Sequence, residues 1–370
     1  MSLLPPGSCA EIVTLSRRDL IRMLALVRTL YGLSKHPAYL AYLHNLIPEI
    51  ARYNPGHDGV LMGYDFHISP EGPKLIEVNT NAGGLWLACQ SAGHGEEAFA
   101  PRLAHKLLQM FRSEFALWSA TTMATLKTVA IVDAQPTQQF LYPEMQAYAR
   151  LLSQQGIRAF IVDPDELQIT QIGVYVQGER VDLLYNRHCD FYLHSETMTP
   201  IRQAWLNHHV CLSPNPHNYA MLADKQRLID WSTPESLAKL PLKAQQQALL
   251  HATVPKTRLL ANTNLAALWQ QRKNWVFKPD NAFASRGVYL GKKLTLGKFG
   301  ALPPESTLMQ EFIAPSESVD SNGQNYKMDI RLFVYQDQAL ALGARLYQGQ
   351  VTNLRTCGGG FATVKIISPE

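Results

Sequence analysis

The sequence predicts a mixed α/β and α+β protein, in which a parallel α/β layer is flanked by antiparallel hairpins. Strands and helices alternate between residues 128 and 207, as in a parallel layer. Apolar strands separated by polar turns occur at 64–79, 275–290 and 329–346, as in hairpins. A chain of 370 residues is also long enough for two or three subdomains.

The first third of the chain predicts helices around one hairpin. Residues 17–33 carry Leu20, Leu24, Val27 and Tyr31 at helical spacing. Further helices are expected at 38–52 and from about Glu96 to Trp118. Polar residues 121–128 follow, and we place a domain boundary there. The predicted domains are 1–125, 126–222, 223–315 and 316–370.

The α/β layer is predicted from three short apolar strands and the helices between them. The strands are expected at 128–133, 159–163 and 181–186, the helices at 141–155 and 197–207, and a small hairpin at 174–181. The layer lacks the G-x-G-x-x-G pattern of a dinucleotide site. We therefore interpret it as a scaffold or a substrate-side domain.

Composition excludes several classes of protein. The formal charge is +4, without a long Lys/Arg run, so binding of nucleic acid by bulk charge is not expected. The five cysteines are scattered and form no C-x-x-C pair, which fits a reducing compartment and predicts no zinc site. No run of eighteen apolar residues and no secretory signal pattern is present, so we expect a cytoplasmic protein with no membrane span.

Three oxygen-bearing side chains gather on the first hairpin. Glu77 and Asn79 are two residues apart and share one face of a strand. If the chain reverses about Glu71, Asp65 lies opposite Glu77, where two carboxylates repel each other unless a cation lies between them. Such oxygens suit Mg²⁺, which also keeps waters and binds phosphate. The alternative is a solvated hairpin with polar residues facing out.

A second hairpin offers a lysine and a polar loop. Lys278 ends a strand, and Pro279 keeps the chain from becoming helical. The following loop, 280–284, and the Ser285-Arg286-Gly287 stretch after it supply backbone N–H groups, a hydroxyl and an arginine that could close over phosphates. It is not a G-x-x-x-x-G-K-[ST] loop. The alternative is an exposed hairpin with a surface lysine.

A third hairpin, around Gln336–Gln338, carries two arginines. Asp329 and Arg331 share one strand face, and we expect Arg345 within about one residue of the position opposite Arg331. Paired guanidinium groups suit a phosphate or carboxylate anion. Three consecutive glycines at 358–360 allow a backbone to approach a ligand closely. The alternative is a surface arginine pair followed by a flexible tail.

Together these stretches resemble the ATP-grasp superfamily of carboxylate ligases. In that family, two lobes of antiparallel sheet with helices clamp ATP, here expected after a Rossmann-like α/β domain. The E-V-N strand at 77–79 comes early in this chain, whereas it comes last in the common form. The order is similar to the circularly permuted arrangement of glutathionylspermidine synthases and eukaryotic glutathione synthetases. Two departures are the single glycine of the phosphate loop, Gly287, and Ala82 in place of the usual proline.

The resemblance also implies roles for particular residues, by their motifs. The implied Mg²⁺ ligands are Asp65, Glu77 and Asn79. The implied nucleotide-binding residues are Lys225, Lys278, Ser285, Arg286, Gly287, Gln310, Glu311, Phe312, Ile313 and Glu317. The implied catalytic residues are Arg331, Arg345, Asn353 and Arg355.

The resemblance predicts an ADP-forming carboxylate–amine ligase that uses ATP and Mg²⁺ and passes through an acyl phosphate. Its substrates would be a small amine and an amino-acid, peptide or natural-product carboxylate, and a homodimer is compatible with it. A small-molecule kinase on the same fold and a non-catalytic nucleotide-binding module remain as alternatives. We expect the metal hairpin to face Lys278, Arg331 and Asn353 across one cleft.

Overall fold

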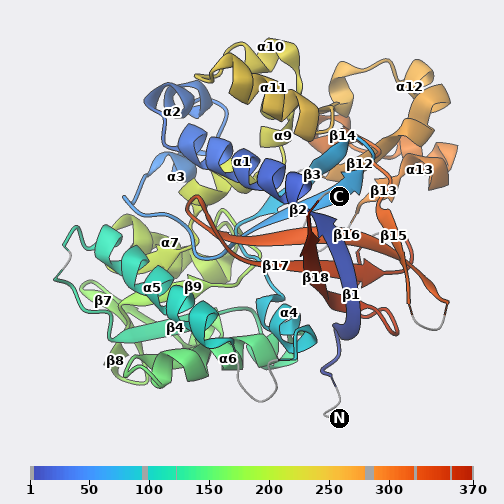
Figure 1. Cartoon of the computed structure of the whole chain (residues 1–370). Coiled ribbons are helices and arrows are strands. Elements are labelled where there is room, and N and C mark those ends of the chain that lie inside the picture. Colours follow the sequence, from blue (N-terminus) through green and yellow to red (C-terminus); the bar gives the residue numbers. More distant parts are fainter. Residues whose placement is uncertain are drawn as a thin grey trace.

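The computed structural model describes residues 4–93, 99–121, 123–279, 287–320, 323–350 and 352–368. Its strands form four sheets, and Figure 1 shows their arrangement. The strands are β1 (Ser8–Ser16), β2 (Met62–Ser69), β3 (Gly72–Asn79), β4 (Thr128–Val132), β5 (Arg158–Val162), β6 (Gln168–Thr170), β7 (Gly173–Val176), β8 (Glu179–Arg180), β9 (Leu183–Asn186), β10 (Cys211–Ser213), β11 (Thr257–Leu259), β12 (Trp275–Pro279), β13 (Tyr289–Leu290), β14 (Thr307–Glu311), β15 (Ser316–Val319), β16 (Asn325–Tyr335), β17 (Gln338–Tyr347) and β18 (Gly360–Ile367).

The α-helices pack around these sheets. They are α1 (Arg17–Ser34), α2 (Pro37–Leu43), α3 (Glu49–Arg52), α4 (Leu85–Ser91), α5 (Pro101–Trp118), α6 (Tyr142–Ser153), α7 (Thr199–Leu206), α8 (Pro216–Asn218), α9 (Arg227–Ser232), α10 (Pro234–Leu237), α11 (Ala244–Thr253), α12 (Leu265–Gln271) and α13 (Leu296–Gly300).

The largest sheet combines strands from the two ends of the described chain. Its order is β1-β18-β17-β16-β2-β3, and β15 pairs with β16 at the side. β1 and β18 run parallel, and the other pairs are antiparallel. Figure 1 shows the blue strands β2 and β3 beside the red strands β16 and β17. The early E-V-N strand therefore belongs to the same sheet as the late arginine hairpin.

Helix α1 is positioned by its cap and its apolar face. The Ser16 hydroxyl accepts a hydrogen bond from the backbone N–H of Asp19 at 3.0 Å, which satisfies one of the free donors of the first turn. Leu26 and Leu30 are buried in the core cluster that also contains Tyr64 and Leu332 of the large sheet. The helix therefore covers one face of this sheet, and the prediction of a helix at 17–33 is confirmed.

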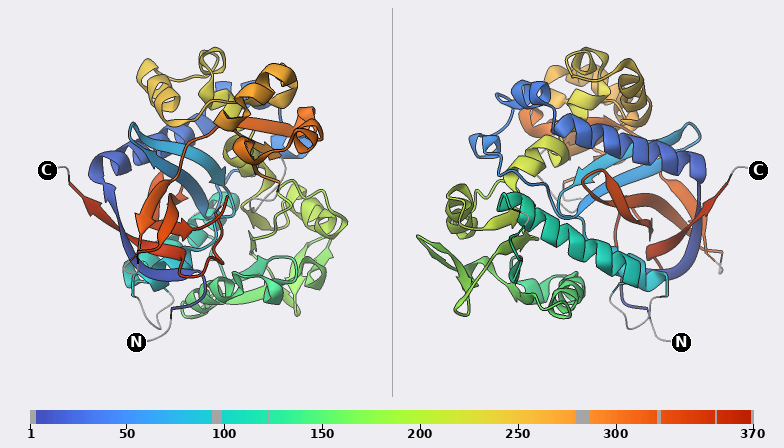
Figure 2. Two further views of the ribbon diagram at one scale, coloured as in Figure 1. Left: turned by 90° about the vertical axis from the view of Figure 1, so that its right-hand side faces the viewer. Right: turned by 60° about the vertical axis from the view of Figure 1, so that its left-hand side comes forward.

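The α/β layer is a parallel sheet of order β10-β9-β4-β5. Val129 and Ile131 of β4 pack with α5 and α6, whereas Ala130 and Val132 pack with α7. Helices thus cover both faces, as the short apolar strands require. The second antiparallel sheet has the order β11-β14-β12-β13. Figure 2 shows it in orange and the α/β layer in green, at opposite ends of the molecule.

Several expected elements differ from the structure. The helix expected at 38–52 is two helices, α2 and α3, because the chain leaves the helix after Leu43 and Pro48 precedes α3. The helix expected from Glu96 starts at Pro101, and α4 precedes it; residues 94–98 lie outside the described residues. Strand β15, which pairs with β16, was not predicted from the sequence.

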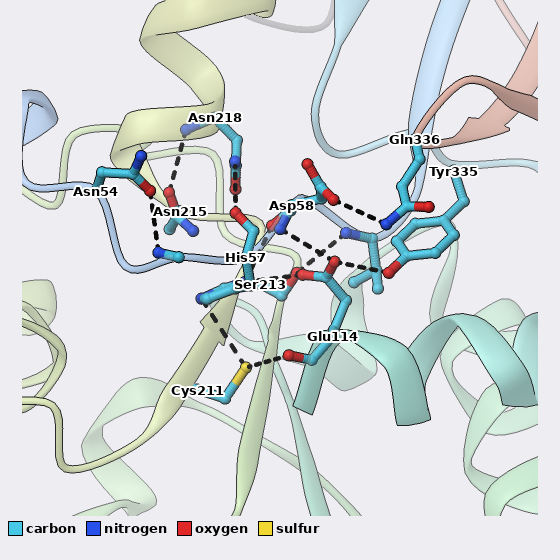
Figure 3. Close-up of polar contacts among 12 residues, drawn as sticks. Asn54, His57, Asp58, Glu114, Cys211, Ser213, Asn215, Asn218, Tyr335 and Gln336 are labelled. Atoms are coloured by element: carbon cyan, nitrogen blue, oxygen red, sulfur yellow. Dashed lines mark hydrogen bonds and ion pairs between the residues drawn. The ribbon is translucent and has the colours of Figure 1, made fainter. Parts of the chain in front are cut away.

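A buried polar cluster joins the α/β layer to the large sheet (Figure 3). Nδ1 of His57 lies 2.8 Å from Oε2 of Glu114, and both side chains are fully buried. The Ser213 hydroxyl donates to Oε2 of Glu114 at 2.8 Å, and the Tyr335 hydroxyl donates to Oε1 at 3.0 Å. Burial alone would lower the pKa of His57, but Cys211 and Glu114 beside it raise that pKa well above its usual value. The hydrogen bonds and the ion pair of Glu114 therefore connect helix α5 to the segment before β2, to strand β10 and to the end of β16.

Candidate active site

Charged side chains form a row across four neighbouring strands of the large sheet. Asp65 on β2 lies opposite Glu77 on β3 and opposite Arg331 on β16. Asp329, two residues before Arg331, lies opposite Arg345 on β17. Directly opposed residues share one face of a sheet, as do residues two apart on one strand. All five side chains therefore project from the same face.

The predicted pairing of Asp65 with Glu77 is confirmed. The turn is tighter than expected, because Ser69 pairs with Gly72. A register shift between Asp65 and Phe66 adds one residue and restores the expected pairing. The alternation rule predicts the face shared by Glu77 and Asn79, and the bulge places Asp65 on that face.

The predicted position of Arg345 is wrong by two residues. Arg331 lies opposite Gly343, and Arg345 lies opposite Asp329. The tight turn, in which Tyr335 pairs directly with Gln338, and the register shift after Phe333 offset each other, so the register equals a plain reversal about Asp337, which places Gly343 and not Arg345 opposite Arg331. The two arginines still converge, because both guanidinium groups contact the carboxylate of Asp65.

Asp65 is the centre of a buried ionic network. Arg331 donates from Nε to Oδ1 and from Nη2 to Oδ2, each at 2.6 Å, and Nη2 of Arg345 lies 2.9 Å from Oδ2. Nε of Arg345 donates to Oδ1 of Asp329 at 2.5 Å, and the Thr352 hydroxyl donates to Oδ2 of Asp329 at 2.6 Å. Burial alone would raise the pKa of Asp65, but Arg331 and Arg345 hold it well below its usual value.

A cavity of about 260 Å³ lies beside this network, between the two antiparallel sheets. It is lined by residues from the large sheet, from β12 to β14 and from the segment after α8. The predicted site residues that line it are Asp65, Glu77, Asn79, Lys225, Lys278, Gln310, Glu311, Phe312, Ile313, Glu317 and Arg345. The structure thus brings eleven of the predicted residues to one cavity.

Lys278 is buried in the wall of the cavity and bridges the two sheets. Its Nζ donates to Oε1 of Gln310 at 2.7 Å and to the carbonyl oxygen of Ile76 at 3.2 Å. Nε2 of Gln310 donates to the same carbonyl oxygen at 3.3 Å. Burial lowers the pKa of Lys278 to about 8, against the opposing effect of Glu77. A cation held by neutral oxygens in this way is available to an anionic ligand.

The segment from Gln310 to Ile313 passes along the cavity at the end of β14. Nδ1 of His67 lies 2.8 Å from the carbonyl oxygen of Ile313, so β2 contacts this segment directly. Glu317 lies on β15 opposite Lys327, and both line the cavity. Residues 310–313, which the resemblance implies bind the nucleotide, therefore lie at a contact between the sheets.

Other predicted residues lie away from the cavity lining. Arg331 lies behind Asp65 and also donates from Nη1 to the carbonyl oxygen of Gly83 at 3.0 Å. Asn353 and Arg355 are exposed: Oδ1 of Asn353 accepts from the backbone of Arg355, whose guanidinium lies 5.4 Å from the Phe140 ring centroid. Gly287 is exposed, with φ of 72°. Ser285 and Arg286 lie outside the described residues.

Polar residues of the cavity that were not predicted as site residues include His67, Lys327, Tyr347 and Thr352. Lys327 and Tyr347 are two residues from Asp329 and Arg345, so strand alternation alone could have placed them on the same face. His67 is separated from Asp65 by the bulge, which the sequence does not reveal. Thr352 directly precedes the predicted Asn353, and its contact with Asp329 depends on a loop.

The glycine pair after β3 is held by the α/β layer. Glu144 accepts hydrogen bonds from the backbone N–H groups of Gly84 at 2.9 Å and Trp86 at 2.9 Å. Nη1 of Arg187 donates to the carbonyl oxygen of Ala82 at 3.3 Å. Gly84 has φ of 95°, and a Cβ atom there would overlap the ring of Phe361. A glycine is therefore required where β3 leads into α4.

The side chains of β3 can hold a magnesium ion. Asn79 donates from Nδ2 to Asp65 at 3.3 Å and to Glu77 at 3.4 Å, which leaves its Oδ1 free to accept or ligate. No group of three or more His, Cys, Asp or Glu side chains in the described part of the chain is arranged to hold a metal. Mg²⁺ commonly takes only one or two carboxylates and fills its shell with water and phosphate oxygens. The carboxylate of Glu77 and Oδ1 of Asn79 fit that donor set.

The sequence matches no protein-family model. It also has no significant match among curated proteins. Among solved structures, the chain is similar to a glutathione synthetase-like effector, GSS30, from Globodera pallida, with a TM-score of 0.61 and 10% identity over 97% of this chain and 90% of that one. It is also similar to a gamma-glutamylcysteine synthetase-like protein from Methylobacillus flagellatus KT, with a TM-score of 0.52 and 9% identity over 92% and 87% of the two chains.

These likenesses extend over almost the whole chain and show its fold. The chain has an ATP-grasp-like fold, in agreement with the fold class and the resemblance inferred from the motifs, whereas the circular permutation stays a prediction. No helix in the described ranges is both long and apolar enough to cross a bilayer.

Proposed function

We propose that the protein is an ATP-dependent, ADP-forming carboxylate–amine ligase. The observation that supports this best is the cavity between the two antiparallel sheets, where Lys278, Glu77 and Arg345 converge. Lys278 and Arg345 come from opposite walls, and Glu77 lies in the same wall as Arg345. A site that combines buried cations with a free carboxylate suits a metal-bound polyphosphate. The ATP-grasp-like fold supports the same conclusion.

The residues of the cavity would act by positioning and by neutralising charge. Gln310 to Ile313 would bind the adenine edge, and Glu317 would bind the ribose. Lys278 and Lys225 would bind phosphate oxygens, and Arg331 and Arg345 would stabilise charge on the transferred phosphoryl group and its acceptor. Mg²⁺ held by Glu77 and Asn79 would neutralise charge on the phosphate oxygens. Asn353, Arg355, Ser285, Arg286 and Gly287 remain predicted site residues.

The proposed reaction has two displacements. A carboxylate oxygen of the first substrate attacks the γ-phosphorus, and ADP leaves as the terminal P–O bond breaks. The amine nitrogen of the second substrate then attacks the carbonyl carbon of the acyl phosphate, inorganic phosphate leaves, and the nitrogen loses a proton. The protein supplies no nucleophile in this scheme, so fixed charges carry the catalysis.

The finer features of the proposal follow from the sequence. The order of the motifs supports a circularly permuted arrangement, with domains at 1–125, 126–222, 223–315 and 316–370. The carboxylate substrate would be an amino acid, a short peptide or a natural product, and the α/β layer would contribute to its binding. Cytoplasmic localisation and a homodimer also remain predictions.

The test measures ADP and phosphate released from ATP, with candidate carboxylates supplied with and without amines. A ligase requires both substrates and releases ADP, phosphate and an amide in equal amounts. A kinase would form a phosphorylated product without the amine. A binding module would bind a non-hydrolysable ATP analogue with Mg²⁺ and release no ADP with any mixture, and that result would overturn the proposed chemistry.

A further inference from the structure

Asp65 occupies a different chemical position from Glu77, although the two lie side by side on the sheet. Only 1% of Asp65 is exposed, and its two oxygens receive three hydrogen bonds or ion-pair contacts from guanidinium groups, at 2.6, 2.6 and 2.9 Å. Oδ2 also receives the amide of Asn79 at 3.3 Å. A carboxylate has about four lone-pair sites, so little capacity remains on Asp65 for another ligand.

Glu77 is in the opposite situation. It is half-buried, it lines the cavity, and the one hydrogen bond recorded for its carboxylate in the described chain is the long 3.4 Å contact from Asn79. Of the two facing carboxylates, Asp65 is therefore paired with protein cations, whereas the Glu77 carboxylate faces the cavity and can bind a ligand there. This division also explains how two adjacent carboxylates are tolerated on one sheet face.

The arginines depend on Asp65 as much as Asp65 depends on them. Arg331 and Arg345 are both mostly buried, and both contact the same carboxylate. Arg345 has a second carboxylate partner, Asp329, whereas the other recorded partner of Arg331 is the neutral carbonyl oxygen of Gly83. Two buried cations this close repel each other unless an anion lies between them. The bidentate contact fixes the plane of the Arg331 guanidinium as well as its position.

We propose that Asp65 is a positioning residue that fixes the two arginines of the cavity, and that it is not a metal ligand. Glu77 and Asn79 hold the cation without it. Asp65 and Asp329 hold Arg345 between them, and Asp65 is the carboxylate that orients Arg331. The loss of Asp65 leaves the metal site formed and the arginines misplaced. The Mn²⁺ and turnover measurements below rest on the proposed function, and the unfolding measurement does not.

The first experiment separates metal binding from arginine positioning. Mn²⁺ binding is measured by electron paramagnetic resonance in the presence of a non-hydrolysable ATP analogue, for wild type, Asp65→Asn and Glu77→Gln. Asparagine keeps an oxygen that can accept from Asn79. We expect Glu77→Gln to weaken Mn²⁺ binding by about tenfold or more, because a charged partner is lost, and Asp65→Asn to change it by less than about threefold. Equal weakening in both variants would overturn the proposal.

The second experiment needs no nucleotide. Thermal unfolding is compared for Asp65→Asn, Arg331→Gln and the double variant. If Asp65 anchors Arg331, the melting temperature of the double variant lies above the value expected from adding the two single losses, because each single change leaves a buried charge unpaired. Additive losses would overturn the anchoring role. The matched pair Glu77→Gln and Arg331→Gln, which share no recorded contact, should be additive.

The third measurement distinguishes a positioning role from general destabilisation. ADP formation by Asp65→Asn should fall by about tenfold or more at saturating Mg²⁺ and ATP, while the nucleotide affinity stays near that of wild type. If Asp65→Asn alone does not fold, Mn²⁺ binding is measured on the double variant that combines Asp65→Asn with Arg331→Gln. A wild-type protein that binds no nucleotide would overturn the proposed ligase, and the unfolding cycle would still decide the role of Asp65.

Discussion

The ammonium group of Lys278 lies 2.7 Å from Oε1 of Gln310, in a wall where its hydrogen-bond partners are neutral. Burial lowers the pKa of this lysine to about 8, with Glu77 acting to raise it and Lys225 to lower it further. A nucleotide triphosphate in the cavity would bring negative charge to the ammonium and raise its pKa. Nucleotide binding and protonation of Lys278 are therefore coupled.

The first prediction is a pH dependence of nucleotide affinity. Below pH 8, Lys278 is already charged, so the affinity for an ATP analogue should be constant. Above pH 8, binding requires uptake of a proton, and the affinity should fall by up to about tenfold per pH unit. Calorimetry in buffers of different ionisation enthalpy measures both the affinity and the proton uptake. Lys278→Arg, which stays charged, should remove the dependence, and a flat wild-type profile from pH 7.5 to 9.5 would contradict the assignment.

The second prediction concerns Glu77. Glu77→Gln should reduce ADP formation by about 100-fold or more, because a preorganised charge at the phosphates is lost. Its melting temperature should stay unchanged or rise, since the change removes a like charge beside Asp65. The control is Glu71→Gln in the exposed turn of the same hairpin, which should turn over normally. Turnover of Glu77→Gln equal to wild type would exclude Glu77 as a metal ligand.

The third prediction tests the glycine pair that follows β3. Gly84→Ala forces a side chain into the ring of Phe361 at a backbone φ of 95°. Overpacking of this kind should cost about 1–3 kcal/mol of folding free energy, measured by urea unfolding. Gly297→Ala is the matched control, because a Cβ atom there meets no atom within 4 Å and the residue lies in α13. The control should be neutral or more stable by about 0.5–1 kcal/mol.

The fourth prediction concerns the buried pair of His57 and Glu114. The folded pKa of His57 is raised, so the ion pair contributes its full stability below the unfolded pKa of about 6.5 and loses it as the pH rises toward the folded pKa. The free energy of unfolding should therefore fall with pH above 6.5, by up to about 1.4 kcal/mol per unit. Chemical unfolding of wild type and His57→Gln from pH 6 to 9 measures this, and their difference should shrink as pH rises.

Two further variants of the same cluster provide stability losses with which the loss in His57→Gln can be compared. Glu114→Gln leaves a buried imidazolium without its partner and should cost about 3–5 kcal/mol near pH 6. Tyr335→Phe removes a single hydrogen bond to Glu114 and should cost about 1.5–3 kcal/mol at every pH in the range. Equal and pH-independent losses in all three variants would show that His57 is neutral in the folded protein.

Much of the fold and of the cavity could be predicted from local sequence patterns. Alternation places Glu77 and Asn79 on one face, and the turn residues after Ile68 predict the hairpin that carries them. The Lys278 strand is predicted by its apolar run and by Pro279. The order of the motifs then predicts that these residues share one cavity. That inference requires no knowledge of individual contacts.

The remaining features depend on long-range pairing. β1 was not predicted, because its partner β18 lies about 350 positions later and pairs in parallel with no connecting turn to read. The position of Arg345 depends on a register shift after Phe333, and one-residue shifts leave no mark in composition. The engagement of Asp65 by two arginines also has no local signal, because Asp65 and Arg331 meet only when β2 and β16 pair.

The pairing of β16 with β2 has a consequence for the order in which the protein can be completed during synthesis. β2 and β3 emerge from the ribosome early, but β16 and β18 must be made before the large sheet can close. At about 5–20 residues per second, the interval between residues 79 and 367 lasts roughly 15–60 s. Until β16 has been made, the edge of β2 that it later covers is open, and Asp65 lacks its contact with Arg331. The nascent chain should therefore be a client of chaperones that protect unpaired strands.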